Sequence, residues 1–131
     1  MAKQKSIKEM LTEMKDFSVL AVDLSYLSIL FGSKDIAKEV VNIAKKMDEL
    51  RYGLEKANLK AAATGGMDED DLIGILRLAA YSERISDVAA DLAKKVLTGQ
   101  IHEIEKKAIK ESEEQFVRFK VEKELEKRTI A

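Results

Sequence analysis

The chain has 131 residues, enough for one domain with a core, and 46% of them are hydrophobic. Its 23 basic and 24 acidic residues nearly cancel and form no basic cluster, which argues against nucleic acid as a partner. Cysteine and proline are absent and glycine occurs six times, so disulfides and thiolate metal sites are excluded and long helices are favoured.

The first predicted helix begins after Ser6 and ends near Phe31. Ser6 and Glu9 have the spacing of a capping box, in which each side chain accepts a hydrogen bond from the other's backbone N–H. Apolar residues then recur at the spacing of one helix face: Ile7, Met10, Leu11, Met14, Phe17, Ala21 and Leu24. Gly32 and Ser33 end this helix and cap the next one.

Two further long helices follow. The second ends at Gly65-Gly66, and the third begins at Asp68 and ends at Gly99. The apolar face of the second contains Ile36, Val40, Ile43, Met47, Leu50, Leu54, Ala57 and Ala61. That of the third contains Leu72, Ile75, Leu76, Ala79, Ile85, Ala89, Leu92, Ala93 and Val96. Because the joints are short, we expect an all-α fold, an up-down-up antiparallel bundle of three long helices over residues 1–100.

Residues 101–131 are expected to form a C-terminal extension. Residues 101–115 are rich in charge and weakly amphipathic, which predicts a short helix. In Phe116 to Glu122, the apolar residues Val117, Phe119 and Val121 alternate with charged ones, a pattern typical of a half-buried strand. A single strand is not stable alone, so this segment either pairs with another strand or stays helical and continues the preceding helix.

The N-terminal sequence lacks the features of a secretory signal. The most apolar stretch, Val19 to Phe31, is too short to span a bilayer and is interrupted by Asp23, Ser25 and Ser28. We therefore expect a soluble, cytoplasmic protein without direct membrane insertion, which leaves docking on a membrane protein open.

Asp23 lies within this apolar stretch, where a carboxylate needs a compensating charge or donor. A metal ion, an arginine or helix-capping donors would each serve. Arg51 lies in phase with the inner face of the second helix, so an Asp23–Arg51 ion pair is the favoured interpretation.

Glu83 and Asp87 are four residues apart and share one face of the third helix, and Asp48 is positioned to join them across the bundle. Carboxylates alone select hard cations such as Mg²⁺, Mn²⁺, Ca²⁺ or ferric iron, so these three residues are the candidate metal ligands. The alternative is a solvated acidic stripe paired with Arg84 or Arg77.

No catalytic arrangement is recognisable. Ser82 and Ser86 fall near the middle of the third helix's apolar face, where small residues favour close helix packing. The single histidine, His102, cannot be placed beside them, and no oxyanion loop is present. We therefore expect a protein that is not an enzyme.

Apolar residues exceed what three helices can bury. The first helix is apolar nearly all round from Val19 to Phe31, and the second has an additional apolar flank of Ala37, Val41, Tyr52 and Leu59. Helices that are apolar on two sides need partners on two sides. The sequence therefore predicts a homodimer.

The run SERISDVAADLAKKVLTG, from Ser82 to Gly99, resembles the third-helix motif of the PhoU family, whose core here is Glu83 to Asp87. The segments EMKDFSVLAVDLSYLSILFG and DIAKEVVNIAKKMDELRYGL resemble the first two helices, so the resemblance covers about residues 6–100. It implies metal binding at Glu83 and Asp87, with Asp48 by position. Val88 and Asp91 stand where members often carry histidine and asparagine, and Tyr52 stands where a second acid would follow Asp48.

The resemblance implies a regulatory or adaptor module of membrane ion transport, for phosphate or potassium, that acts as a helical dimer on a transporter or channel component. The tail ESEEQFVRFKVEKELEKRTIA resembles the lead-in to a TrkA C-terminal domain, as in archaeal-type potassium-transport regulators, and implies that such a domain is missing or truncated. A purely structural dimerisation bundle of a larger protein is the alternative. A di-iron enzyme is disfavoured because Glu-x-x-His ligand pairs are lacking.

Overall fold

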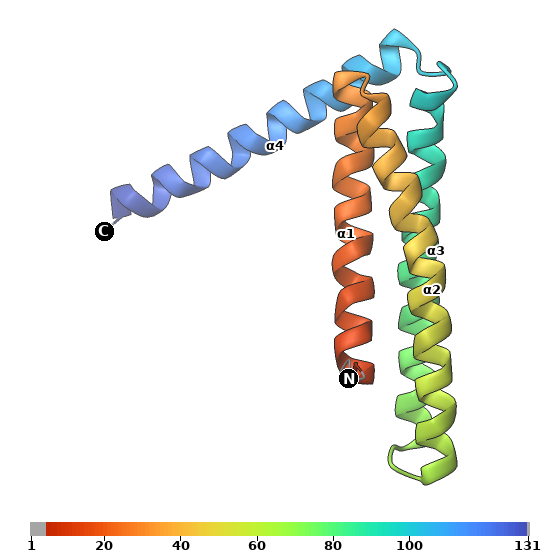
Figure 1. The fold of residues 1–131 in the computed structure, drawn as a ribbon. Coiled ribbons are helices and arrows are strands. Elements are labelled where there is room, and N and C mark those ends of the chain that lie inside the picture. The colour runs from red at the N-terminus through yellow and green to blue at the C-terminus, as the bar shows by residue number, and fades with distance from the viewer. Residues whose placement is uncertain (1–4, 131) are drawn as a thin grey trace.

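The computed structural model describes residues 5–130 and contains four helices: α1 (Ile7–Phe31), α2 (Lys34–Thr64), α3 (Glu69–Leu97) and α4 (Glu103–Ile130). Helices α1, α2 and α3 lie side by side and alternate in direction, whereas α4 leaves the end of the bundle where α3 finishes (Figure 1). The predicted up-down-up bundle is confirmed.

The prediction of a strand in the tail is wrong, because no strand occurs within residues 5–130 and Val117, Phe119 and Val121 lie in α4. The tail helix is also longer than expected, with 28 residues. The described part of the chain offers no other strand to pair with, so the backbone satisfies its hydrogen bonds within a helix. Alternating apolar residues then lie on different sides of that helix.

The predicted caps of α1 and α2 are observed, although of the Ser6–Glu9 capping box only the Ser6 side-chain bond is formed. The Ser6 hydroxyl accepts from the Glu9 backbone N–H at 3.1 Å, and the Ser33 hydroxyl accepts from that of Ile36 at 3.2 Å. Gly32 and Gly65 end α1 and α2 with φ of 58° and 68°, in the left-handed region where a Cβ would be strained. Short connections of this kind hold successive helices antiparallel.

Small residues fill much of the bundle interior. Its buried alanines and serines are Ser18, Ala21, Ser25, Ser28, Ala37, Ala79, Ser86, Ala89, Ala90 and Ala93. Each buried serine donates to a backbone carbonyl of its own helix; Ser28, for example, donates to the Ser25 oxygen at 2.7 Å. The helices therefore approach closely without leaving these hydroxyls unpaired.

The predicted core is largely confirmed, with three corrections. Leu76 and Ile85, which were assigned to the core face of α3, are exposed. Ala37, which was assigned to an outer flank of α2, is fully buried. These residues lie at the borders of the apolar faces, where periodicity alone does not say which side is buried. The angles at which the helices cross decide whether such a border residue faces the core or the solvent.

The fully buried Leu54 and the 72% exposed Leu59 give a matched pair of substitutions on α2. Leu54→Ala should lower the free energy of unfolding by about 2–5 kcal/mol, because it leaves a cavity. Leu59→Ala should change it by less than about 0.5 kcal/mol. Urea unfolding followed by circular dichroism measures both, and equal effects would contradict the packing.

Candidate functional site

Arg51 of α2 links two helices through carboxylates. Its Nη1 donates to Glu83 Oε2 of α3 at 3.0 Å, and its Nε donates to Glu55 Oε1 at 3.0 Å. The Glu83 side chain is only 16% exposed, whereas that of Glu55 is open to solvent. The hydrogen bond to Glu83 is the main cause that raises the pKa of Arg51, so the guanidinium stays charged.

The predicted acidic residues are neighbours in the structure. Burial raises the pKa of Glu83, the hydrogen bond from Arg51 opposes this, and the nearby Asp48 adds to the increase. Burial also raises the pKa of Asp87, followed by the negative charges of Asp48 and Asp91. Asp48 therefore lies near enough to both Glu83 and Asp87 to act on them, and these three residues with Arg51 and Glu55 form a group that we call the acidic cluster.

The acidic cluster is not preformed as a metal site. Among the described residues, no three histidine, cysteine, aspartate or glutamate side chains are arranged to hold an ion. Arg51 already contacts the Glu83 carboxylate and supplies part of the positive charge that a cation would bring. The oxygen donors suit a hard cation, but their present arrangement does not fit one.

Arg51 also settles two of the pairings expected from the sequence. The Asp23–Arg51 pair is wrong, because Asp23 is exposed and Arg51 binds Glu55 and Glu83 instead. Arg84 and Arg77, the expected partners of the acidic stripe, form no ion pair with it in residues 5–130, and Arg84 lies over the Tyr81 ring. The inner position of Arg51 correctly indicated that it pairs with a shielded carboxylate on another helix, but that carboxylate is Glu83 of α3.

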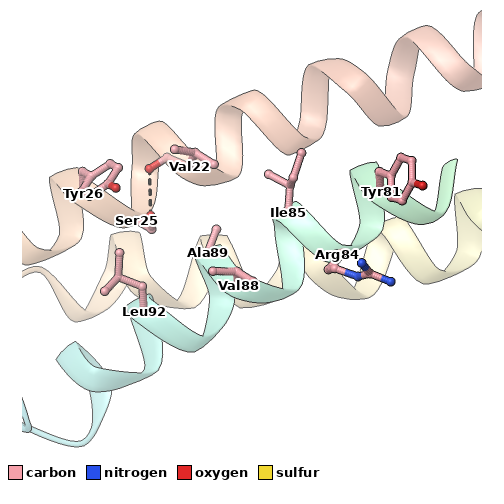
Figure 2. Close-up of a pocket in the computed structure, with 9 residues that line it drawn as sticks. All are labelled: Val22, Ser25, Tyr26, Tyr81, Arg84, Ile85, Val88, Ala89 and Leu92. Atoms are coloured by element: carbon pink, nitrogen blue, oxygen red, sulfur yellow. Dashed lines mark hydrogen bonds between the residues drawn. The ribbon is translucent and has the colours of Figure 1, made fainter. Parts of the chain in front are cut away.

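A second feature is a groove between α1 and α3, which we call the α1/α3 groove. Figure 2 shows its lining of Val22, Ser25 and Tyr26 from α1 and Tyr81, Arg84, Ile85, Val88, Ala89 and Leu92 from α3. It has a volume of about 310 Å³. The Ser25 hydroxyl donates to the Val22 carbonyl, as the dashed line in Figure 2 marks. Arg84 is the only ionisable side chain of the lining besides the two tyrosines, so the groove suits an apolar surface rather than catalysis.

The serines of α3 have a structural role. Ser86 is fully buried and donates to the Ser82 carbonyl at 2.9 Å. This agrees with their interpretation as small packing residues rather than nucleophiles.

Sequence reasoning missed Asn58 of α2. It is only 4% exposed, and its Nδ2 donates to the Leu72 carbonyl in the first turn of α3 at 3.0 Å. Its Oδ1 accepts no hydrogen bond within the described part of the chain. A buried amide at this position fixes the register of α2 against α3, and the sequence carries no signal that distinguishes it from a surface asparagine.

Replacing Asp87 tests the electrostatics of the cluster. Its pKa is raised in the folded state, so its ionised form destabilises the fold above that pKa, and this effect disappears as the carboxylate is protonated at lower pH. Asp87→Asn should therefore stabilise the protein at neutral pH and make no difference near about pH 3. Urea unfolding at both pH values measures this. The exposed Asp23→Asn is the control, and an Asp87→Asn protein less stable at neutral pH would contradict the assignment.

Comparison with known proteins bears on the whole bundle. No helix within residues 5–130 combines the length and apolar character needed to cross a membrane. Among curated proteins, none matches the chain. A family model, the PhoU domain, matches residues 11–96, which include most of α1, all of α2 and nearly all of α3. The match covers about two thirds of the chain and the three helices that form the observed bundle, and the chain therefore belongs to the PhoU family.

Proposed function

We propose that this protein is a cytoplasmic regulatory adaptor of membrane ion transport, which acts by docking on a component of a phosphate or potassium uptake system. The observation that carries the proposal is the PhoU-domain match over residues 11–96, because this family has a regulatory role in phosphate transport.

A homodimer is part of the proposal. Large apolar side chains remain exposed on α1, among them Val19, Leu20 and Phe31, and on α3, among them Tyr81 and Val88. Contiguous exposed apolar surface usually marks an interface. Pairing two bundles would cover it and give the adaptor a fixed shape.

The acidic cluster is the proposed contact for the transport component. The acidic cluster contains four carboxylates, those of Asp48, Glu55, Glu83 and Asp87, and one guanidinium, that of Arg51, which contacts Glu55 and Glu83. Burial is the main cause that raises the pKa of Glu83 and Asp87, and the nearby Asp48 adds to it, so an approaching basic group would favour the ionised carboxylates as it binds. A basic segment of the transport component is therefore the partner chemistry that the cluster favours.

Transport measurements in the source organism test this function. Deleting the gene should change the rate of labelled phosphate or rubidium uptake several-fold under replete conditions, and the native gene should restore it. Glu83→Gln/Asp87→Asn should restore it only in part, because the fold is retained while the negative charge is reduced. The matched control Glu9→Gln/Glu13→Gln removes an acid pair of the same spacing from α1 and should restore uptake fully. Unchanged uptake of both ions after deletion would overturn the proposal and favour a structural dimerisation bundle.

A hard cation at Glu83 and Asp87, with Asp48, stays a prediction, and no step of the proposed mechanism depends on it. Binding would require Arg51 to release Glu83. Elemental analysis of protein dialysed against Mg²⁺, Mn²⁺, Ca²⁺ or Fe³⁺ should give a stoichiometric ion in the native chain and in Glu9→Gln/Glu13→Gln. That ion should be lost in Glu83→Gln/Asp87→Asn. Equal metal content in all three proteins would overturn the site.

A further inference from the structure

Helix α4 buries little of its own apolar surface. It packs on the bundle near its start, where Ile101, just before the helix, and Ile109 contact the core, and Lys95 pairs with Glu105 at 3.9 Å. Ile104, on another side of the same first turns, is 78% exposed, and Phe119 farther along is 57% exposed. A helix in water owes most of its stability to the burial of an apolar face, so α4 needs a further partner.

One face of α4 combines apolar and acidic residues. At about 100° per residue, Ile104, Ala108 and Phe119 fall within a sector about 100° wide that also contains Glu111 and Glu122. The lysine side chains between residues 104 and 126 lie outside this sector, and Arg118 lies at its edge, about 20° from Glu111. The best partner for this acidic-apolar face is a surface that is apolar and carries basic residues along its edge, because they would pair with Glu111 and Glu122.

The α1/α3 groove is such a surface. Its α3 wall includes an apolar stripe of Tyr81, Ile85, Val88 and Leu92. The exposed Leu78 continues this stripe beyond the groove, where it lines a neighbouring hollow with Leu11 and Lys15. Arg77 and Arg84 lie along the outer edge of this stripe, and both are exposed. The stripe is about 21 Å long and the α4 face from Ile104 to Phe119 about 22 Å, so the two match in length.

The direction of α4 indicates which chain fills the groove. Its contacts with Ile101, Ile109 and Lys95 hold the start of the helix, and Figure 1 shows the rest running away from the bundle, with α1 between its free end and α3. Reaching its own groove would break these contacts. The groove of a second copy can bind α4 while these contacts stay in place.

We infer that α4 of a second copy lies in the α1/α3 groove as an antiparallel fourth helix, and that two copies exchange these helices reciprocally. In the matching register Ile104 lies near Leu92, Ala108 near Val88 and Phe119 near Leu78. The same register brings Glu111 to Arg84 and Glu122 to Arg77. This inference rests on the homodimer proposed above and states how it is held together.

Cross-linking tests the exchange, because the chain has no cysteine of its own. Val88→Cys and Ala108→Cys proteins, one carrying a mass tag, are mixed and oxidised under mild conditions. The expected product is a disulfide-linked pair with one chain of each kind. Glu113→Cys, on the opposite side of α4 from Ala108, is the matched control and should not cross-link to Val88→Cys.

The other outcomes are separable. A disulfide within a dilute Val88→Cys/Ala108→Cys chain would show that α4 closes on its own groove and would overturn the inference. A dimer in light scattering without the mixed disulfide would overturn the exchange and leave the proposed homodimer intact. A monomer at all concentrations would overturn both.

Charge reversal tests the register independently. Arg84→Glu or Glu111→Arg alone should weaken dimerisation by about tenfold in sedimentation analysis, because each places like charges together. Combining them in one chain should restore the affinity, since each groove then meets the complementary helix. An additive loss in the double variant would overturn the register.

Discussion

The close approach of three helices through small buried side chains is the constraint on which the other features depend. Alanine and serine at positions such as Ala21, Ser25, Ser86 and Ala93 leave little room inside the bundle. Each serine is satisfied by its own helix, so no polar contact between helices is needed at these points. Because small residues occupy the interior of α3, its larger residues, such as Tyr81, lie outside, where they form a groove instead of a core.

The same close packing brings Arg51 of α2 within hydrogen-bond distance of Glu83 on α3. Arg51 pairs with two carboxylates of the acidic cluster, and it joins α2 to α3 where Glu83 is mostly shielded from water. Farther along the same pair of helices, Asn58 holds the Leu72 carbonyl and fixes their register. The cluster thus joins two helices and carries more carboxylates than cations, which is the basis for the basic partner proposed above.

The sequence predicts the bundle well because helix periodicity and capping residues are local signals. Ser6, Ser33 and Gly32 act where they were expected to act, since a cap depends on neighbours within four residues. Pairings across helices were less predictable: Asp23 was matched to Arg51, whose partner on another helix is Glu83. Crossing angles decide such contacts, and periodicity does not contain them. The alternation of apolar and charged residues in the tail led to the wrong prediction of a strand for a related reason. A strand needs a partner strand elsewhere in the chain, whereas a helix forms its hydrogen bonds locally.

The short glycine-ended joints also bear on how the chain folds. Helix α1 packs on α2 and α2 packs on α3, so many of the contacts join segments that are near in sequence; the pairings of α1 with α3 and of α1 with α4 are the long-range exceptions. Helical bundles of such low contact order fold in microseconds to milliseconds. A ribosome adds roughly 5–20 residues per second, so folding is faster than the addition of a single residue. Helix α4 is translated after α1, α2 and α3 and therefore emerges beside a bundle that is already folded.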